Sequence, residues 1–235
     1  MADEEHLKKL LAGLEVWNAW RATEAGASVR PDLAGADLAN AELTGADLAG
    51  ADLMNANLQG AKLMGAHLSG ADLTSANLRD ANLSGAQLWV ADLTNANLRH
   101  AVLANANLMN GTLKGAKLAG TNLTGTLMVE ADLSGAQAAS VKYDRKRMRS
   151  RYRGALVATM DGDPIFKRDA EDQVYLDALE EFTRRSPWKR ALFRLWGITD
   201  FGRDLSSVGV FALAVVFLFG CIYLADYVYL KQLFH

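Results

Sequence analysis

From Pro31 to Gly135 the sequence repeats with a period of five residues, giving twenty-one successive units. Leucine stands at the centre of every unit except one, where Met128 takes its place. Alanine stands two positions before the centre in all but four units, and the exceptions are Pro31, Gly111, Thr121 and Thr126. A strict period over nearly half of the 235 residues limits the chain to folds in which successive units make equivalent contacts.

A period of five fits neither an α-helix nor a flat strand. On a helix, five residues advance by about 140° beyond a full turn, so the leucines would wind around the cylinder. On a strand, the odd spacing would place successive leucines on opposite faces. Alanine and leucine are two residues apart, however, so a short extended piece points both to the same side. The last position of the unit is mostly Gly or Asn, which accept turn dihedrals. We therefore expect a coil with leucine inside and polar side chains outside.

The pattern A-[D/N]-L-x-x resembles the pentapeptide-repeat family. The resemblance implies a mainly β fold, a right-handed quadrilateral β-helix in which four units complete one turn. On this basis residues 31–140 are predicted to form the β-helix. Its coils would number about five, and its height would be roughly 25 Å at a strand spacing of about 4.8 Å.

If four units close a coil, positions twenty residues apart stack on one another. One column then consists of acidic side chains, interrupted only by Thr112: Asp32, Asp52, Asp72, Asp92 and Asp132. Two carboxylates about 4.8 Å apart repel by roughly 0.9 kcal/mol at the dielectric constant of water and by about 3.5 kcal/mol at an effective value of 20. The column is a candidate functional face, and the repulsion within it requires relief.

Three interpretations of the acidic column stay open. In the first, each Asp accepts hydrogen bonds from turn amides. In the second the column binds cations, and in the third it imitates the phosphates of DNA. The third follows from the resemblance, because some pentapeptide-repeat proteins are thought to shield DNA gyrase as DNA mimics. Arg79 stacks on Arg99 on the next predicted face, with His100 close by, and these groups weaken the negative field.

On another predicted face Trp89 and Met109 stack beside Val90 and Leu127. They form an apolar strip that is expected to contact a partner or the chain's own tail.

Residues 1–30 are predicted to form an N-terminal capping helix and leader. The apolar side chains recur at helical spacing: Leu7, Leu10, Leu11, Leu14 and Trp17. Acidic residues precede them, at the end of a helix where negative charge is favourable. A β-helix leaves its first and last coils uncovered, so a cap is expected there.

Residues 141–204 are predicted to form a basic connector with a hairpin-like turn and amphipathic helices. Six basic residues fall within nine positions: Arg145, Lys146, Arg147, Arg149, Arg151 and Arg153. They are expected to form either a solvated linker or a contact to lipid headgroups. Asp161 and Gly162, between apolar flanks, predict the turn. A helix is expected to begin after Ser186, and its aromatic and basic residues are typical of a membrane interface: Trp188, Arg190, Arg194 and Trp196.

Residues 205–230 are predicted to form one transmembrane helix, followed by a short external tail at 231–235. The eighteen residues from Val208 to Ala225 carry no charge and would extend about 27 Å as a helix. Basic residues lie mainly before this segment, so the rod is expected in the cytoplasm and the C-terminus outside. Tyr227 and Tyr229 fall where an aromatic belt would lie. The expected location is the inner membrane of a bacterium.

The sequence from Phe166 onward resembles the connector and first transmembrane helix of bacterial pentapeptide-repeat proteins with a potassium-channel-type pore. In that family a filter loop and a second membrane helix follow, and this chain stops at His235 without either. The chain also lacks the short motifs of phosphate-binding loops, zinc peptidases, serine hydrolases and dithiol oxidoreductases. It has a single cysteine, Cys221, so a cysteine cluster is excluded.

These features favour a non-enzymatic protein with no cofactor and no metal site. The first hypothesis is a membrane-anchored cytoplasmic scaffold or interaction protein. The alternative is the cytoplasmic and first-helix portion of a potassium-channel-like subunit, and the second alternative is a DNA-mimic inhibitor of a type II topoisomerase. The expected partners are the lipid bilayer and a protein partner or a further copy of the chain, a tetramer if channel-like. Nucleic acid is disfavoured as a partner.

Overall fold

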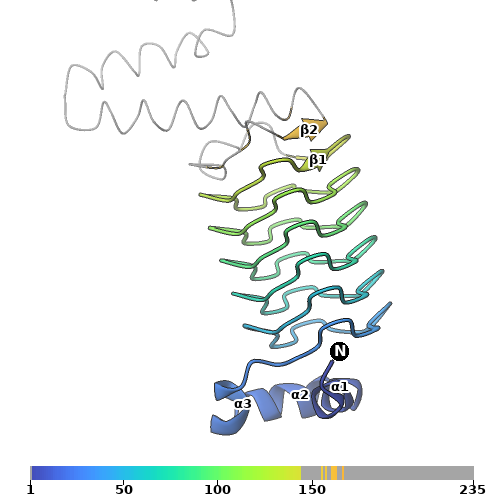
Figure 1. Ribbon diagram of the computed structural model, residues 1–235, viewed down its shortest axis with the longest axis vertical. Coiled ribbons are helices and arrows are strands. Elements are labelled where there is room, and N and C mark those ends of the chain that lie inside the picture. The colour runs from blue at the N-terminus through green and yellow to red at the C-terminus, as the bar shows by residue number, and fades with distance from the viewer. Residues whose placement is uncertain (1, 144–154, 156, 158–159, 163–165, 167–235) are drawn as a thin grey trace, which may run out of the picture. The chain divides into compact units, whose positions relative to one another are not determined.

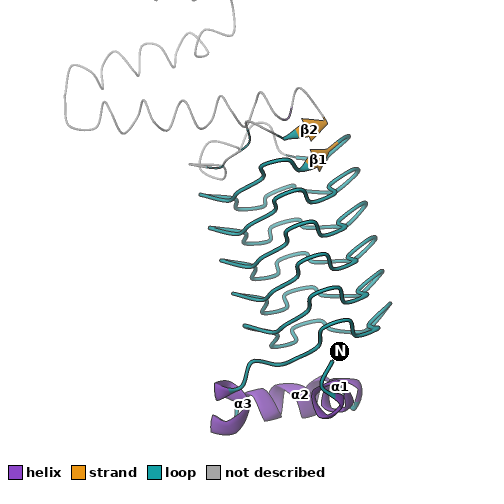
Figure 2. Ribbon diagram, in the orientation of Figure 1, coloured by secondary structure: helices purple, strands orange, loops and turns teal. Residues whose placement is uncertain are grey.

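The computed structural model describes residues 2–143, 155, 157, 160–162 and 166. The chain divides into two compact units, Met1–Tyr175 and Leu176–His235, and the second lies outside the described residues. The regular elements of the described part are three helices and two short strands: α1 (Glu4–Leu11), α2 (Leu14–Arg21), α3 (Glu24–Ser28), β1 (Gln137–Ala138) and β2 (Asp161–Gly162). Between α3 and β1 the chain winds in regular coils, with the helices at one end and the two strands at the other (Figures 1 and 2).

The coils stack by parallel pairing between residues twenty positions apart. The first four pairs are Asp32 with Asp52, Asp37 with Asn57, Glu42 with Lys62 and Asp47 with His67, and the same register continues to Asn122 with Lys142. Four five-residue units therefore complete one turn, which confirms the predicted stacking. We number the sides of the rod faces 1 to 4, beginning with the units that contain Asp32, Asp37, Glu42 and Asp47, respectively.

Each inner unit satisfies four of its five backbone amides with backbone carbonyls. In the unit 51–55, the amides of Asp52, Leu53 and Asn55 donate to neighbouring coils at 2.8, 2.7 and 3.0 Å. The amide of Ala56 then closes the turn on the carbonyl of Leu53 at 3.0 Å. This pattern leaves one amide per unit, that of the residue after the central leucine, for a side-chain acceptor.

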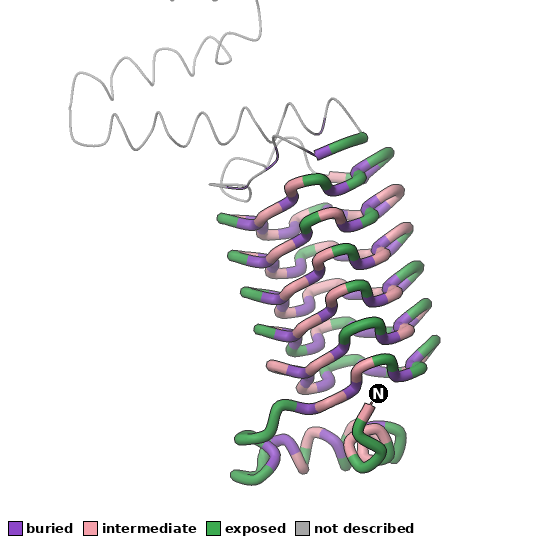
Figure 3. Tube along the Cα trace, in the orientation of Figure 1, coloured by how far each residue is buried: buried purple, intermediate pink, exposed green. Residues whose placement is uncertain are grey.

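The interior of the rod is built from the central leucines and the alanines that precede them. These side chains are almost all inaccessible to solvent, and Met128 is fully buried in the one leucine position that it takes. Figure 3 shows buried positions alternating with exposed ones along every coil. Thr121 and Thr126 replace alanine without leaving a polar group unpaired, because their hydroxyls donate to the carbonyls of Leu98 and Leu103 at 2.7 and 2.8 Å.

The N-terminal cap contains three helices, where the sequence predicted a single one. Helix α1 ends at Leu11, and Gly13 has a φ of 123°, a conformation that glycine adopts without steric cost and that other residues avoid. The chain turns there, and α2 carries Trp17 into the interior with no exposed surface. The turn rotates Leu11 away from the core, so that it is 65% exposed, and its predicted place on the apolar stripe is wrong.

At the other end of the rod, Asp161 and Gly162 form β2, and the predicted hairpin-like turn at these residues is wrong. Strand β2 pairs in parallel with β1, Gln137 against Asp161 and Ala138 against Gly162. The amide of Asp161 donates to the carbonyl of Ala136 at 2.8 Å, which is the bond made by the equivalent residue of every inner unit. The segment therefore adds another layer to the rod.

The residues around β2 also follow the repeat. The amide of Met160 donates to the carbonyl of Val157 at 3.0 Å, as in the turns of the inner units. Three buried residues continue the pattern of the units. In one further unit Ala155 takes the alanine position and Val157 the leucine position, and Met160 takes the alanine position of the next. Phe166 is fully buried and packs edge-on against Tyr143 with ring centroids 4.9 Å apart. These side chains cover the last coil.

In the part of the chain that the structure describes, no helix combines the length and the hydropathy needed to cross a bilayer. The predicted transmembrane helix at 205–230, the amphipathic helices before it and the tail at 231–235 all lie outside the described residues.

Candidate functional site

The acidic residues predicted on face 1 form one column. Parallel pairing places Asp32, Asp52, Asp72 and Asp92 on successive coils, and the column continues through Thr112 to Asp132. In each of these Asp residues, Oδ1 accepts the amide of the residue two positions later, at 2.9 to 3.1 Å. This amide is the one that the backbone pattern leaves unpaired. The bond favours the first of the three interpretations of the column.

Two basic side chains reduce the repulsion within the column. Arg30 places Nη2 3.3 Å from Oδ2 of Asp52 and 3.4 Å from Oδ2 of Asp72. At the far end, Nζ of Lys114 lies 3.1 Å from Oδ2 of Asp132. Asp92, which lies between these pairs, has no ion pair with any described residue. Asp32 likewise has no ion pair with a described residue, so the unpaired negative charge of face 1 lies at Asp32 and Asp92.

The Asp132 carboxyl has a pKa below its ordinary value of 3.8. Burial alone would raise the pKa, but hydrogen bonds from the side chain and the amide of Ser134 and the positive charge of Lys114 together outweigh it. Within the described ranges, no three His, Cys, Asp or Glu side chains are grouped to hold a metal ion.

Face 2 carries a ladder of amides that the sequence analysis did not identify. Asn57 donates to Oδ1 of Asp37 at 2.8 Å, Asn77 to Oδ1 of Asn57 at 3.1 Å, and Asn97 to Oδ1 of Asn77 at 3.2 Å. Asn at four-unit intervals was the available signal. Arg79 and Arg99 lie on the same face on successive coils, as predicted, and Asp80 pairs with the Arg79 side chain at 3.3 Å.

Face 4 carries the apolar side chains that the sequence placed on one wall. The amide of Val90 donates to the carbonyl of Met109, and that of Asn110 to the carbonyl of Val129, so Trp89, Met109 and Val129 stack on three coils. Trp89 is 53% exposed and Val90 is 50% exposed. The others are half-buried. We call this set the face 4 patch: Trp89, Val90, Met109, Leu127 and Val129.

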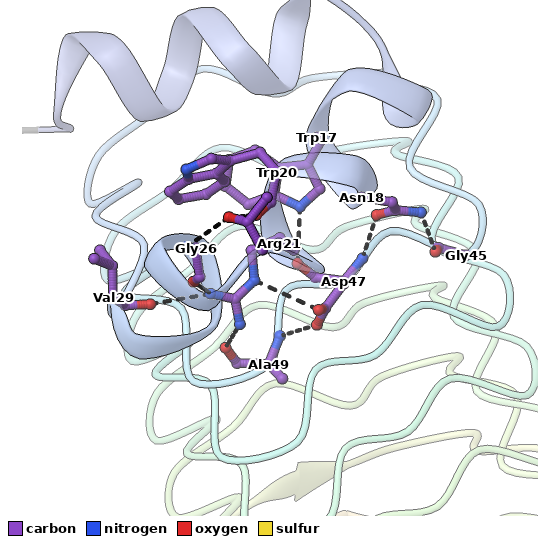
Figure 4. Close-up of polar contacts among 10 residues, drawn as sticks. Trp17, Asn18, Trp20, Arg21, Gly26, Val29, Gly45, Asp47 and Ala49 are labelled. Atoms are coloured by element: carbon purple, nitrogen blue, oxygen red, sulfur yellow. Dashed lines mark hydrogen bonds and ion pairs between the residues drawn. The ribbon is translucent and has the colours of Figure 1, made fainter.

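The N-terminal cap is fixed to the first coil by polar contacts (Figure 4). Nε1 of Trp17 donates to the carbonyl of Asp47 at 2.8 Å. The Asn18 amide group donates to the carbonyl of Gly45 at 3.1 Å and accepts the amide of Asp47 at 2.9 Å. Because these bonds use a carbonyl of face 3 and the carbonyl and amide of Asp47 on face 4, the cap covers the first coil at this corner of the rod.

Arg21 joins the helices of the cap to the rod. Its buried guanidinium donates to the carbonyls of Gly26, Val29 and Ala49 at 2.6, 3.0 and 3.0 Å. Its Nε lies 3.5 Å from Oδ2 of Asp47 without a hydrogen bond. Apart from this Nε, the polar groups of Arg21 bond to carbonyls of the chain itself, so the contacts in Figure 4 are structural.

The remaining residues that the sequence singled out lie outside the described part of the chain, and their predicted roles stay predictions. These are the basic patch Arg145, Lys146, Arg147, Arg149, Arg151 and Arg153, and the interface residues Trp188, Arg190, Arg194, Trp196, Tyr227 and Tyr229.

Comparison with known proteins agrees with the repeat pattern. The model of pentapeptide repeats matches in eight copies, over residues 32–70, 71–110, 91–125 and 106–139. The chain belongs to the pentapeptide-repeat family. No curated protein matches the chain.

Three solved structures, two of them of pentapeptide-repeat proteins, illustrate the likeness. A protein from the cyanobacterium Cyanothece 51142 is 32% identical over 48% of this chain and 61% of its own, with a TM-score of 0.35. A protein from the thylakoid lumen of Arabidopsis thaliana is 31% identical over 59% of this chain and 86% of its own, with a TM-score of 0.36. QnrB1, a plasmid-mediated fluoroquinolone resistance protein, is 20% identical over 46% of this chain and 59% of its own, with a TM-score of 0.35. This chain thus spans about three fifths of the cyanobacterial protein and of QnrB1.

Proposed function

We propose that this pentapeptide-repeat protein is a non-catalytic scaffold whose rod binds a protein partner. The observation that carries the proposal is the face 4 patch. It exposes about half of Trp89 and half of Val90 on a rod whose other faces are mostly polar. The interior offers no alternative site, because it is filled by leucine and alanine side chains with almost no exposed surface.

We extend the proposal to the rest of the chain, with residues 205–230 as a membrane anchor and the rod on the cytoplasmic side. Two features of the sequence support this extension. Val208 to Ala225 form an uncharged stretch of bilayer length, and the basic residues of the C-terminal part precede it. An anchored rod would bring its partner to the inner membrane.

The DNA-mimic alternative has less support. Asp52 and Asp72 share Arg30, and Asp132 pairs with Lys114, so three of the five column carboxylates are neutralised. Arg79 and Arg99 add positive charge to the neighbouring face. A phosphate-like surface needs an uninterrupted negative potential, which these ion pairs break.

The anchoring proposal is tested with the full chain in bacterial cells. Cys221→Ser removes the native thiol, and Gln232→Cys then places a single thiol beyond the proposed anchor. We expect a membrane-impermeant maleimide to label this variant in intact cells. The matched control, Ser28→Cys on an exposed residue of the cap, should react only after lysis. Labelling of Gln232→Cys only after lysis would contradict the proposed topology.

The scaffold proposal is tested separately, by the mass of the assembly extracted in a mild detergent. We expect native mass spectrometry to show a complex of this chain with a different protein. A mass equal to that of a single copy of this chain, with no other protein bound, would contradict the scaffold function. A tetramer of this chain alone would instead favour the channel-like alternative.

A further inference from the structure

Val90 has a backbone conformation that its side chain disfavours. Its φ is 58°, in the left-handed region, and it is the one β-branched residue with a positive φ in the described part of the chain. The equivalent position on the coils directly before and after is Gly70 and Asn110, which accept this conformation readily. Strain of this kind persists where the rest of the structure compensates for it, and it clusters at functional sites.

Internal packing does not explain Val90, because its side chain is 50% exposed and points out of the rod beside Trp89. A second departure from the repeat lies on the same face. Leu127 stands where Asp or Asn accepts the free amide in many other units; Val102 and Lys117 make the same kind of replacement on other faces, but Leu127 adds an apolar side chain to this wall. Both departures remove a stabilising feature and extend one apolar surface, which indicates a surface used by a partner.

The charge around the patch identifies the chemistry of that partner. Val90 is two residues before Asp92, around the corner onto face 1, and Val129 is followed by the exposed Glu130. Asp92 is the column residue between the two sets of ion pairs, and no described basic side chain neutralises it. The apolar patch is thus bordered by negative charge. A second copy of this rod would bring a like-charged border to the same place, which opposes self-association.

We infer that the face 4 patch binds a basic, amphipathic segment of another protein. An aromatic or aliphatic side chain of that segment packs on Trp89 and Val90, and its Lys or Arg residues pair with Asp92 and Glu130. Aromatic anchors at the centre of a polar border are the usual arrangement of an energetic hot spot. The inference rests on the proposed scaffold function and specifies the partner's chemistry.

The test uses the full chain in nanodiscs of phosphatidylcholine and short fluorescent peptides as probes, with empty nanodiscs as the blank. One peptide carries leucines and a tryptophan flanked by lysines, a second has glutamate in place of lysine, and a third has serine in place of the apolar residues. Fluorescence anisotropy measures binding. We expect only the first peptide to bind, and more weakly as the salt concentration rises.

Variants locate the site. Trp89→Ser should weaken binding by about tenfold or more, and Asp92→Asn by a smaller factor together with a weaker salt dependence. The matched control is Met64→Ser, which removes a side chain that is 49% exposed on face 3 and should leave binding unchanged. Val90→Asn is the most informative variant. It should raise the unfolding temperature, because it relieves the left-handed strain, and still weaken binding.

Two results would overturn the inference. Equal binding of the lysine and glutamate peptides would remove the role of charge, and equal loss in Trp89→Ser and Met64→Ser would remove the site from face 4. If the native complex with another protein persists in either case, the scaffold function stands and its contact surface lies elsewhere. If native mass spectrometry finds no complex with another protein, the scaffold proposal is wrong, and the inference about the partner's chemistry is wrong with it.

Discussion

At the scale of single residues, an Asp or Asn directly before the central leucine completes the hydrogen bonding of the units that contain it. Neighbouring coils accept three amides and the turn accepts a fourth, while the fifth, that of Thr94 for example, donates to Oδ1 of Asp92 at 2.9 Å. Asn107 does the same for Met109 at 3.2 Å. Carboxylate and carboxamide are equivalent in this role because both present an oxygen two residues from the amide. The preference in the sequence therefore reflects an acceptor and does not require a charge.

A pair of variants at Asp92 separates the acceptor from the charge. Asp92→Asn keeps the bond to the amide of Thr94, so we expect the free energy of unfolding to change little. Asp92→Ala leaves that amide without its acceptor and should lower the free energy of unfolding by about 1 kcal/mol. Urea unfolding monitored by circular dichroism measures both. Equal losses in the two variants would show that the charge, and not the oxygen, is what Asp92 supplies to folding.

Asp132 predicts a dependence on pH. Burial raises its folded-state pKa, but the hydrogen bonds from Ser134 and then the contact with Lys114 lower it further than burial raises it. These contacts add stability above the pKa of the unfolded chain, and this stability is lost as the pH falls through the folded pKa. Asp132→Asn should therefore lower the free energy of unfolding by about 0.5 kcal/mol at neutral pH, and the difference from the natural chain should vanish in strong acid. Lys114→Gln should produce part of this loss, and adding it to Asp132→Asn should cause no further loss. A constant difference at all pH values would contradict this.

The sequence predicts most of the residue-scale structure of the rod, because leucine, alanine and the turn residues recur with one period. It places the Asp column correctly but leaves its role open, since Arg30 lies before the repeat and the period gives it no position. The strain at Val90 also stays hidden, because the conformation of the fifth position is known only once the coil is built.

At the scale of elements, the two ends of the rod are covered in different ways. The N-terminal end is covered by α2, whose Trp17 is fully buried and bonds to the first coil. The C-terminal end is covered by further turns of the chain, in which Val157 and Met160 continue the repeat and Phe166 packs on Tyr143. Both solutions protect the terminal coils from pairing with other chains.

Substitutions at Trp17 measure how much the cap contributes. Trp17→Phe keeps most of the buried surface and removes the bond to the carbonyl of Asp47, so we expect a loss of about 1 to 2 kcal/mol in the free energy of unfolding. Trp17→Ala also leaves a cavity and should cost about 3 to 5 kcal/mol. Thermal and urea unfolding provide the measurement. The matched control is Trp89→Phe on the exposed patch, which should be close to neutral, and a loss there as large as in Trp17→Phe would contradict the assignment.

The ends are where sequence reasoning gave wrong elements. Leu7 to Trp17 show one helical period, and the break at Gly13 follows from the need to lay α2 on the first coil, a tertiary requirement that local spacing does not contain. Asp161 and Gly162 have the composition of a turn, but they pair with Gln137 and Ala138 because the repeat resumes at Ala155. The sequence between Tyr143 and Ala155 interrupts the period, so the period alone does not predict the later units.

At the scale of the whole molecule, the stacked coils make the rod a nearly one-dimensional structure. Each coil contacts the coils directly before and after it, and its interior offers the same leucine and alanine surface at every level. The same regularity that makes each junction stable would allow an uncovered end to stack on the end of another rod. The last layer, with Val157 and Phe166, is therefore expected to control association as well as stability.

Val157→Asp tests this role of the last layer. The side chain is 3% exposed, so a carboxylate there should open the end of the rod, lower the unfolding temperature and expose the coil that contains Gln137. Because the exposed coil presents unpaired amides and carbonyls, we expect the full chain in detergent to associate end to end as its concentration rises, measured by sedimentation velocity. The matched control is Val16→Asp in α2, where the side chain is 50% exposed and the same change should affect neither property. If Val157→Asp is destabilised but remains as dispersed as the natural chain, the last layer supports folding without limiting association.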